Sequence, residues 1–203
     1  MNFSDASSAY TTAQGLAGGT SLTGDTLGVG PANDLAPGVY FFSSSASIDG
    51  TLILDAEGSN SATWVFQIGS TLGTASASSV EVIDAGSAGP FTGSITWAVG
   101  TSATLGTTTT FLGTIISDTG ADTLGTGATI GCGRVISLGA AVSLDDNDIG
   151  TPADCTVTDT GTIASVSVPA PTPEPGTFAL FLSGLLAVGL LTFRKSRVSS
   201  PSC

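Results

Sequence analysis

Short runs of alternating apolar and polar residues recur along the middle of the chain. In residues 63–68 and 94–99 every second side chain is large and apolar, and each run contains one tryptophan. Because successive side chains of a β-strand point to opposite faces, this alternation predicts strands with one buried face. Similar strands are predicted at residues 39–43, 114–117 and 134–138.

A repeated phrase accompanies these strands. Thr-Leu-Gly-Thr starts at Thr71, Thr104 and Thr123, and a degenerate fourth copy starts at Ser143. The last three starts are 19 and 20 residues apart, and the first gap of 33 fits one such period plus an inserted loop. A period of this size is typical of a β-solenoid in which each repeat forms one coil. The leucine of each copy, including Leu144, is predicted to point inward and the preceding hydroxyl residue outward.

The pattern divides the chain into four segments. Residues 1–34 are predicted to contain a helix at 5–16 followed by a loop, and residues 35–149 to form five coils. Residues 150–172 lose the repeat and are predicted to be a proline-rich linker, and residues 173–203 form a terminal segment. A third short strand in each period gives a triangular cross-section. The predicted fold class is therefore all-β, a three-sided β-solenoid with one short α-helix alongside.

The terminal segment has the pattern of a membrane helix. Residues 177–193 carry no charge and are followed at once by Arg194, Lys195 and Arg197. Seventeen uncharged residues are at the lower limit for a spanning helix. Because basic residues mark the cytoplasmic end of such a helix, the β-rich body is expected on the other side of the membrane.

Composition excludes several classes of function. The chain has 16 acidic residues, and before Arg194 the only basic residue is Arg134, so nucleic acid and anionic lipid surfaces would be repelled. It has no histidine, and its acids are scattered over predicted turns. A β-helical polysaccharide lyase or hydrolase would need paired carboxylates or a basic residue in a cleft. We therefore expect no enzyme activity, no cofactor and no metal, and we interpret residues 145–148 as a solvated acidic turn.

Three cysteines leave two possibilities open. Cys132 falls inside a repeat where a small buried residue would fit, Cys155 lies just beyond the last coil, and Cys203 ends the chain. We expect a buried free thiol at Cys132. A disulfide between Cys132 and Cys155 is the alternative in an oxidising compartment.

The tail resembles a PEP-CTERM sorting signal. Pro173, Glu174 and Pro175, a short apolar segment and the basic cluster Arg194, Lys195 and Arg197 follow one another in the order of that signal. The resemblance implies export by a Gram-negative bacterium, processing by an exosortase, and display at the cell surface or release.

The body resembles the bacterial and fungal ice-binding protein family, whose fold is a discontinuous β-solenoid. The resemblance spans about residues 35–149 and includes ATWVFQIGSTLGTASASSV and SITWAVGTSATLGTTTTFLGTI. It implies a helix packed along the solenoid and an ice-binding face on one flat side. It also predicts a signal peptide and several strands ahead of the helix, which this sequence does not contain. We therefore expect a truncated gene model, with a gene fragment as the alternative.

Some members of that family carry the motif Thr-(Ala/Gly)-X-(Thr/Asn) on this face. Residues 126–129 match it, residues 74–77 depart at the last position and residues 107–110 at the second. Threonine suits ice because its methyl group excludes water while its hydroxyl can join the lattice, and its χ1 angle is stiff. The predicted ice-binding residues are Thr71, Thr74, Ser102, Thr104, Thr107, Thr109, Thr123, Thr126, Thr129 and Ser143.

Hydroxyl ladders also occur on solenoids that bind nothing, because threonine is a good strand former. The alternative function is therefore a structural or adhesive surface protein that contacts exopolysaccharide through the same solenoid. Such a protein would favour exposed aromatic residues, whereas Trp64 and Trp97 are predicted to lie in the core.

Overall fold

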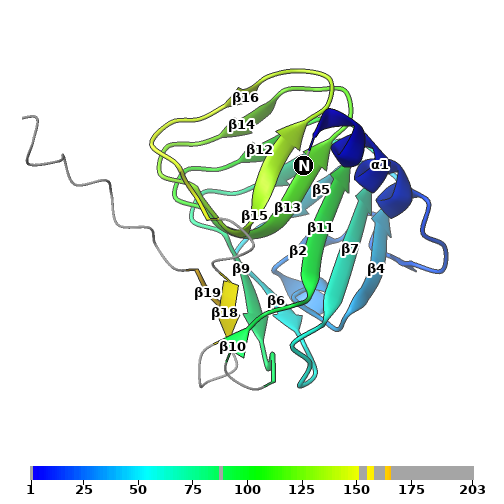
Figure 1. The fold of residues 1–203 in the computed structure, drawn as a ribbon, viewed down its shortest axis with the longest axis vertical. Helices are drawn as coiled ribbons and strands as arrows, with labels where there is room; N and C mark the ends of the chain where they lie inside the picture. The colour runs from blue at the N-terminus through cyan, green and yellow to red at the C-terminus, as the bar shows by residue number, and fades with distance from the viewer. Residues whose placement is uncertain (1, 87–88, 151–154, 158–162, 166–203) are drawn as a thin grey trace, which may run out of the picture. The chain divides into compact units, whose positions relative to one another are not determined.

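The computed structural model describes residues 2–86, 89–150, 155–157 and 163–165, and these form a three-sided β-solenoid with one helix alongside (Figure 1). One side is a six-stranded parallel sheet, and because each of its strands belongs to one coil, the described residues contain six coils. In chain order its strands are β2 (Thr26–Leu27), β5 (Ala46–Ile48), β8 (Leu72–Thr74), β12 (Ala103–Leu105), β14 (Asp122–Leu124) and β16 (Val142–Ser143). We call this surface the threonine side.

The other two sides belong to one ten-stranded parallel sheet. The helix side consists of β1 (Thr20–Ser21), β4 (Gly38–Phe42), β7 (Thr63–Ile68), β11 (Ser94–Val99) and the second halves of β13 (Thr110–Ser117) and β15 (Thr129–Ser137). The acidic side consists of β3 (Asp34–Leu35), β6 (Thr51–Asp55), β9 (Ser79–Ile83), the first halves of β13 and β15, and β17 (Asp148–Ile149). The two sides form one sheet because β13 and β15 run through the corner between them.

Two predictions about the coils are corrected by this topology. The first coil (β1, β2 and β3, with the 3-10 helix η1 at Gly30–Ala32) lies in a stretch that was predicted to be a loop. The strands predicted at residues 114–117 and 134–138 are continuous with the third strands that precede them. Short strands with few large residues give too weak an alternation to be recognised in the sequence.

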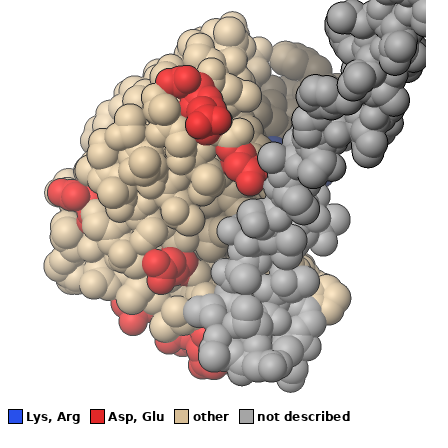
Figure 2. Space-filling view, turned by 90° about the vertical axis from the view of Figure 1, so that its left-hand side faces the viewer, with Lys and Arg blue, Asp and Glu red and all other residues tan. Residues whose placement is uncertain are grey.

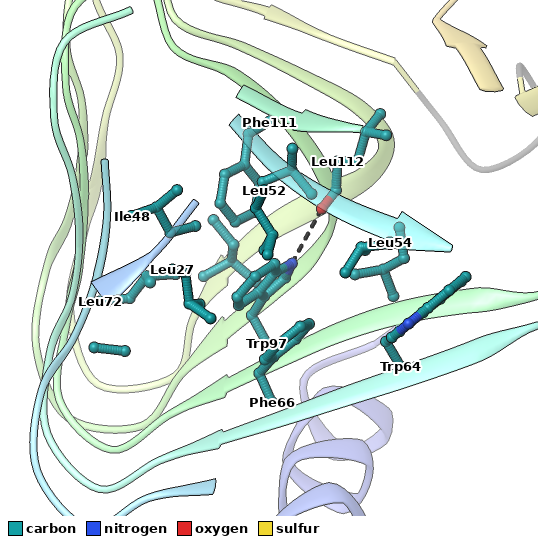
Figure 3. Close-up of a cluster of buried hydrophobic side chains, with 14 of the residues drawn as sticks. Leu27, Ile48, Leu52, Leu54, Trp64, Phe66, Leu72, Trp97, Phe111 and Leu112 are labelled. Carbon is teal, nitrogen blue, oxygen red and sulfur yellow. Dashed lines mark hydrogen bonds between the residues drawn. The ribbon is translucent and has the colours of Figure 1, made fainter. Parts of the chain in front are cut away.

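The interior is filled by side chains from all three sides (Figure 3). On the inner face of the helix side, the rings of Phe66 and Trp97 stack with centroids 3.8 Å apart, and Tyr40 and Phe111 extend this aromatic row at either end. The indole N–H of Trp97 donates to the carbonyl of Leu112 at 3.0 Å, so its polar atom is satisfied. Trp64 and Trp97 are fully buried, which confirms their prediction as core residues.

The helix α1 (Phe3–Gln14) packs on the outer face of the helix side. The capping box of Asn2 and Asp5 starts the helix and Gly15 is its C-cap, so the helix begins and ends two residues earlier than predicted. Ala13 packs against Val65 and Ala98, which are outward residues of this side. These contacts bury the outer face of the middle strands.

The chain after the last coil is fixed to the body. Cys132 and Cys155 form a disulfide with their Cα atoms 5.2 Å apart, so the expected free thiol at Cys132 is wrong. A small antiparallel sheet follows, with the order β10 (Gly89–Pro90), β18 (Cys155–Val157) and β19 (Ile163–Ser165). The predicted linker at residues 150–172 therefore contains two short strands.

The remaining predictions for the C-terminal part concern positions that the structure does not describe. The sorting signal and the membrane helix at residues 177–193 lie outside the described residues. Among the helices that are described, none has the length and apolar character needed to cross a bilayer.

Candidate binding surface: the threonine side

One row of outward residues runs along the whole threonine side. The strand register aligns equivalent positions of consecutive coils, which in parallel strands lie about 4.7–4.9 Å apart. The aligned residues are Thr26, Ser47, Gly73, Thr104, Thr123 and Ser143. Every member is small and uncharged, and we call this set the central row.

The register corrects the alignment of the first repeat copy. Leu72 pairs with Ala103, and Gly73 pairs with Thr104. The first copy is therefore shifted by two residues, and Thr71 is not equivalent to Thr104. Instead Thr71 and Ser102 lie two positions before Gly73 and Thr104, in a neighbouring row. There the Thr71 hydroxyl donates to that of Ser45 at 2.8 Å.

A second row borders the corner toward the acidic side. The hydroxyl of Thr107 donates to that of Ser76 at 2.9 Å, and the hydroxyl of Thr126 donates to the carboxylate of Asp145. These residues are exposed. We call Ser76, Thr107, Thr126 and Asp145 the corner row.

Between the central row and the corner row, glycine leaves the surface without protruding side chains. A Cβ atom on Gly106 would lie 2.7 Å from the backbone of Ala75, and one on Gly125 would lie 2.8 Å from the backbone nitrogen of Thr107. Real Cβ atoms essentially never come this close, so larger residues would push the coils apart. The glycine of the repeated phrase thus allows close stacking of coils beside the exposed threonines.

Two predicted ice-binding residues point into the solenoid. Thr109 is only 1% exposed, and its hydroxyl shares a hydrogen bond of 2.8 Å with the hydroxyl of Thr74. Thr74 also accepts a hydrogen bond from the backbone N–H of Gly106 at 2.8 Å. The prediction that Thr109 faces outward is therefore wrong, because the corner turns the chain between Thr107 and Thr110. Thr74 was also predicted to face outward, but it is half-buried and pairs with the inward residue Ile48.

The family motif spans a corner instead of one flat side. Thr126 belongs to the corner row, whereas Thr129 pairs with Thr110 and Asp148 and is half-buried on the acidic side. Gly127, between them, has a φ of 69°. The equivalent corner residues of other coils, Gly28, Gly50, Ala77, Thr108 and Asp146, also have positive φ. The structure thus brings seven of the ten predicted residues to the threonine side or its corner row, and it places Thr129 on the acidic side.

The last coil is less regular than the others. Leu144 was predicted to point inward but is 56% exposed, because the structure describes no coil beyond it. Asp145 occupies the position where the three preceding coils have Ser76, Thr107 and Thr126, and its backbone N–H donates to the side chain of Asn147 at 2.6 Å. The hydroxyl surface therefore ends in an acidic turn.

Charge separates the three sides. The two rows of the threonine side contain one charged residue, Asp145, whereas the outward positions of the acidic side include Asp34, Asp55, Glu81 and Asp148. In Figure 2 the acidic side chains stand apart around a broad area without charge. Since α1 covers the middle strands of the helix side, the threonine side is the extended and uncovered surface among the described residues. The two rows carry no charge in the middle coils of this side, whereas Asp25, Asp49 and Asp145 are exposed at its first two coils and its last coil.

A buried carboxyl lies directly beneath this surface, and sequence reasoning missed it. Asp122 is fully buried, and its Oδ1 accepts a hydrogen bond of 2.7 Å from the backbone N–H of Ala103. Burial raises the pKa of Asp122, and hydrogen bonds from Ala103 and Ser117 oppose this in part. The signal in the sequence was an acid at the position that holds Ala103 and Val142 in the two neighbouring coils.

Chemistry that requires a metal has no support in this surface. Among the described residues no group of three His, Cys, Asp or Glu side chains is placed to hold an ion. The surface offers methyl groups, hydroxyls and backbone at regular spacing, which suits adsorption to an ordered solid.

Known proteins are similar to this chain in sequence. Residues 2–150 match the family model described as Ice-binding-like, and residues 171–197 match the PEP-CTERM protein-sorting motif. An ice-binding protein from Nostoc sp. (strain HG1) is 39% identical over 192 residues, which is 94% of this chain. This chain spans 64% of that relative's length.

Solved structures of ice-binding proteins resemble the solenoid. One from an Antarctic biological consortium has a TM-score of 0.63 at 32% identity, covering 73% of this chain and 64% of its own. Another, from the Antarctic ascomycete Antarctomyces psychrotrophicus, has a TM-score of 0.63 at 36% identity, covering 72% of this chain and 68% of its own.

Proposed function

Because the chain belongs to the ice-binding-like family, we propose that it binds ice through the threonine side. The observation that carries the proposal is the central row, which places one small uncharged residue per coil at the same position along six coils. Ice-binding proteins are the relatives named for both its sequence and its fold.

The contact surface that we propose has a centre and a border. Its centre is formed by four exposed threonines, Thr104, Thr107, Thr123 and Thr126. The border consists of Thr71, Ser102 and Ser143, with Thr129 around the corner. Thr74 and Thr109 act from below, because their shared hydrogen bond supports the backbone between the two rows.

The physical basis is adsorption by many weak contacts. Each threonine has a stiff χ1 angle, so little side-chain entropy is lost when it meets a crystal. Its methyl group disfavours liquid water while the hydroxyl can occupy a lattice position. An acidic side chain in this area would hold its own hydration shell, which explains the value of an uncharged surface.

Bulky substitutions on the central row test this proposal. We expect the double variant Thr104→Tyr/Thr123→Tyr to lose most thermal hysteresis and crystal shaping, because two raised side chains prevent flat contact. Its far-UV circular dichroism should stay unchanged. The matched control is Thr51→Tyr/Thr63→Tyr, which places the same two residues at exposed strand positions of the acidic and helix sides.

Full activity in the control and loss in the first variant supports the proposal. Equal hysteresis in both variants would place the ice contact on another surface. If a folded wild-type chain never shapes ice, the adhesive alternative gains support. That alternative has little basis in the described residues, since both tryptophans are buried and neither can stack on a sugar.

The sorting motif indicates an exported or surface protein. We propose that an exosortase processes the chain, and that residues 177–193 hold it in the membrane until then. We also propose that residues 2–150 act without enzymatic activity, since the family is defined by ice binding.

A further inference from the structure

We propose that this protein holds a cell envelope to ice, with the tether and the ice contact on opposite parts of the solenoid. The inference rests on the proposed ice contact of the threonine side. It adds a second attachment, at the corner between the acidic side and the helix side. We call this the opposite corner, and define it by Gly113, Cys132 and residues 56–62, 84–86 and 89–93.

The topology places this corner away from the threonine side. In a coil with a triangular cross-section, the corner between two sides lies opposite the third side. The strand β13 passes through this corner at Gly113, with a φ of 102°, and β15 passes through it at Cys132, with a φ of 55°. In earlier coils the chain forms its longest loops here, between β6 and β7 and between β9 and β11.

The chain that leads to the sorting motif is fixed at the opposite corner. The disulfide joins Cys155 to Cys132, and the backbone N–H of Phe91 donates to the carbonyl of Cys155 at 3.1 Å. The strand β18 also pairs with β10 of the corner loop, and β19 pairs with β18. The matched sorting motif begins at residue 171, six residues after the end of β19.

The disulfide also determines which strands carry the load when tension is applied to the chain that follows Cys155. It encloses the last coil, because the two cysteines are 23 residues apart and β16 and β17 lie between them. These two strands have only two residues each and would peel away easily if tension passed through Gly150. With the bridge closed, tension enters at Cys132 of β15, which pairs with β13 over seven residue pairs.

This arrangement suits a protein that is anchored while it binds. The threonine side, including Ser143 of the last coil, stays in place under tension and is not covered by the attachment. The expected partners are therefore an ice surface on one side and the sorted cell envelope on the other.

Oriented coupling to beads tests the proposal. Cys203 is the one cysteine outside the disulfide, so the full chain can be attached through it by a thioether bond. We expect such beads to adhere to an ice crystal under flow. Beads coupled through the threonine side, in the variant Thr104→Cys/Cys203→Ser, should not adhere.

The bridge is tested on the same beads. In Cys132→Ser/Cys155→Ser we expect hysteresis in solution close to that of the wild type, but detachment from ice at a several-fold lower flow force. Because this variant could fold poorly, wild-type beads are also compared before and after reduction, which leaves the thioether intact.

The outcomes separate the two proposals. Failure of the free wild-type chain to bind ice overturns the proposed function itself. If the free chain binds ice but beads coupled through Cys203 do not adhere, the opposed arrangement is wrong. Equal detachment forces with open and closed bridges overturn the role given to the disulfide.

Discussion

The exposed threonines of the threonine side offer methyl and hydroxyl groups, and their sequence neighbours are small or buried. Thr104 and Thr123 present a methyl and a hydroxyl group from rigid strand positions, and Thr107 and Thr126 repeat this at the corner. Because of these neighbours, nothing rises above the threonines. At this scale the repeated phrase predicted the exposed threonines of two coils, because Thr104 pairs with Thr123 in the structure.

Replacing the acid at the end of the corner row should enlarge the contact surface. Asp145 occupies the position of Thr107 and Thr126 in its coil and accepts a hydrogen bond from the Thr126 hydroxyl. In Asp145→Thr the charge disappears and the Thr126 hydroxyl becomes free to meet ice. We expect higher thermal hysteresis than in the wild type at equal concentration. Unchanged or lower hysteresis would show that the ice contact ends before this coil.

The buried carboxyl of Asp122 should make stability depend on pH. Burial raises its pKa in the folded state above its ordinary value, so the folded chain binds this proton more tightly than the unfolded chain. The contribution of Asp122 to stability therefore falls as pH rises through the interval between the two pKa values. Asp122→Asn keeps an oxygen that can accept from Ala103 and removes the charge.

We expect the stability difference between Asp122→Asn and the wild type to shift in favour of the variant as pH rises from about 4 to about 7. Urea denaturation at several pH values measures it. A difference that does not change with pH would mean that the carboxyl stays equally protonated in both states.

Strands and corners were predictable from the sequence only where side chains alternate strongly. β7 and β11 have the predicted bounds because tryptophan and other large residues mark their inner faces. β1, β2 and β3 have two residues each, and no periodic signal distinguishes them from a loop. The two-residue shift of the first repeat copy was also hidden, since only the pairing of Gly73 with Thr104 reveals it.

The aromatic row beneath the helix side should be a main source of stability for the middle coils. Trp97 is fully buried, stacks on Phe66 at 3.8 Å and donates to the carbonyl of Leu112. Trp97→Ala would remove these contacts and leave a cavity, which costs about 3–5 kcal/mol for a large aromatic residue. Urea denaturation should show a loss of this size, whereas the surface variant Thr51→Ala should lose less than about 0.5 kcal/mol. A loss under about 1 kcal/mol for Trp97→Ala would mean that neighbouring coils refill the space.

At the scale of the whole molecule, we propose a separate role for each part of the solenoid surface. The helix side is buried beneath α1, the acidic side carries charge that favours solubility, and the opposite corner holds the chain that leads to the sorting motif. The threonine side is thus left free for an extended solid. The solenoid and the sorting motif could be predicted from the sequence. The location of the threonine side opposite the corner that holds Cys155 follows only from the strand register and the disulfide.

The most direct test of ice binding by the threonine side measures the protein that a growing crystal takes up. Fluorescently labelled wild type, Thr104→Tyr/Thr123→Tyr and Thr51→Tyr/Thr63→Tyr are each frozen slowly onto an ice hemisphere, and the labelled fraction in the ice is compared. We predict that the wild type and the Thr51→Tyr/Thr63→Tyr control enter the ice and that the central-row variant stays in the liquid. Uptake of the central-row variant at the level of the wild type would contradict the account.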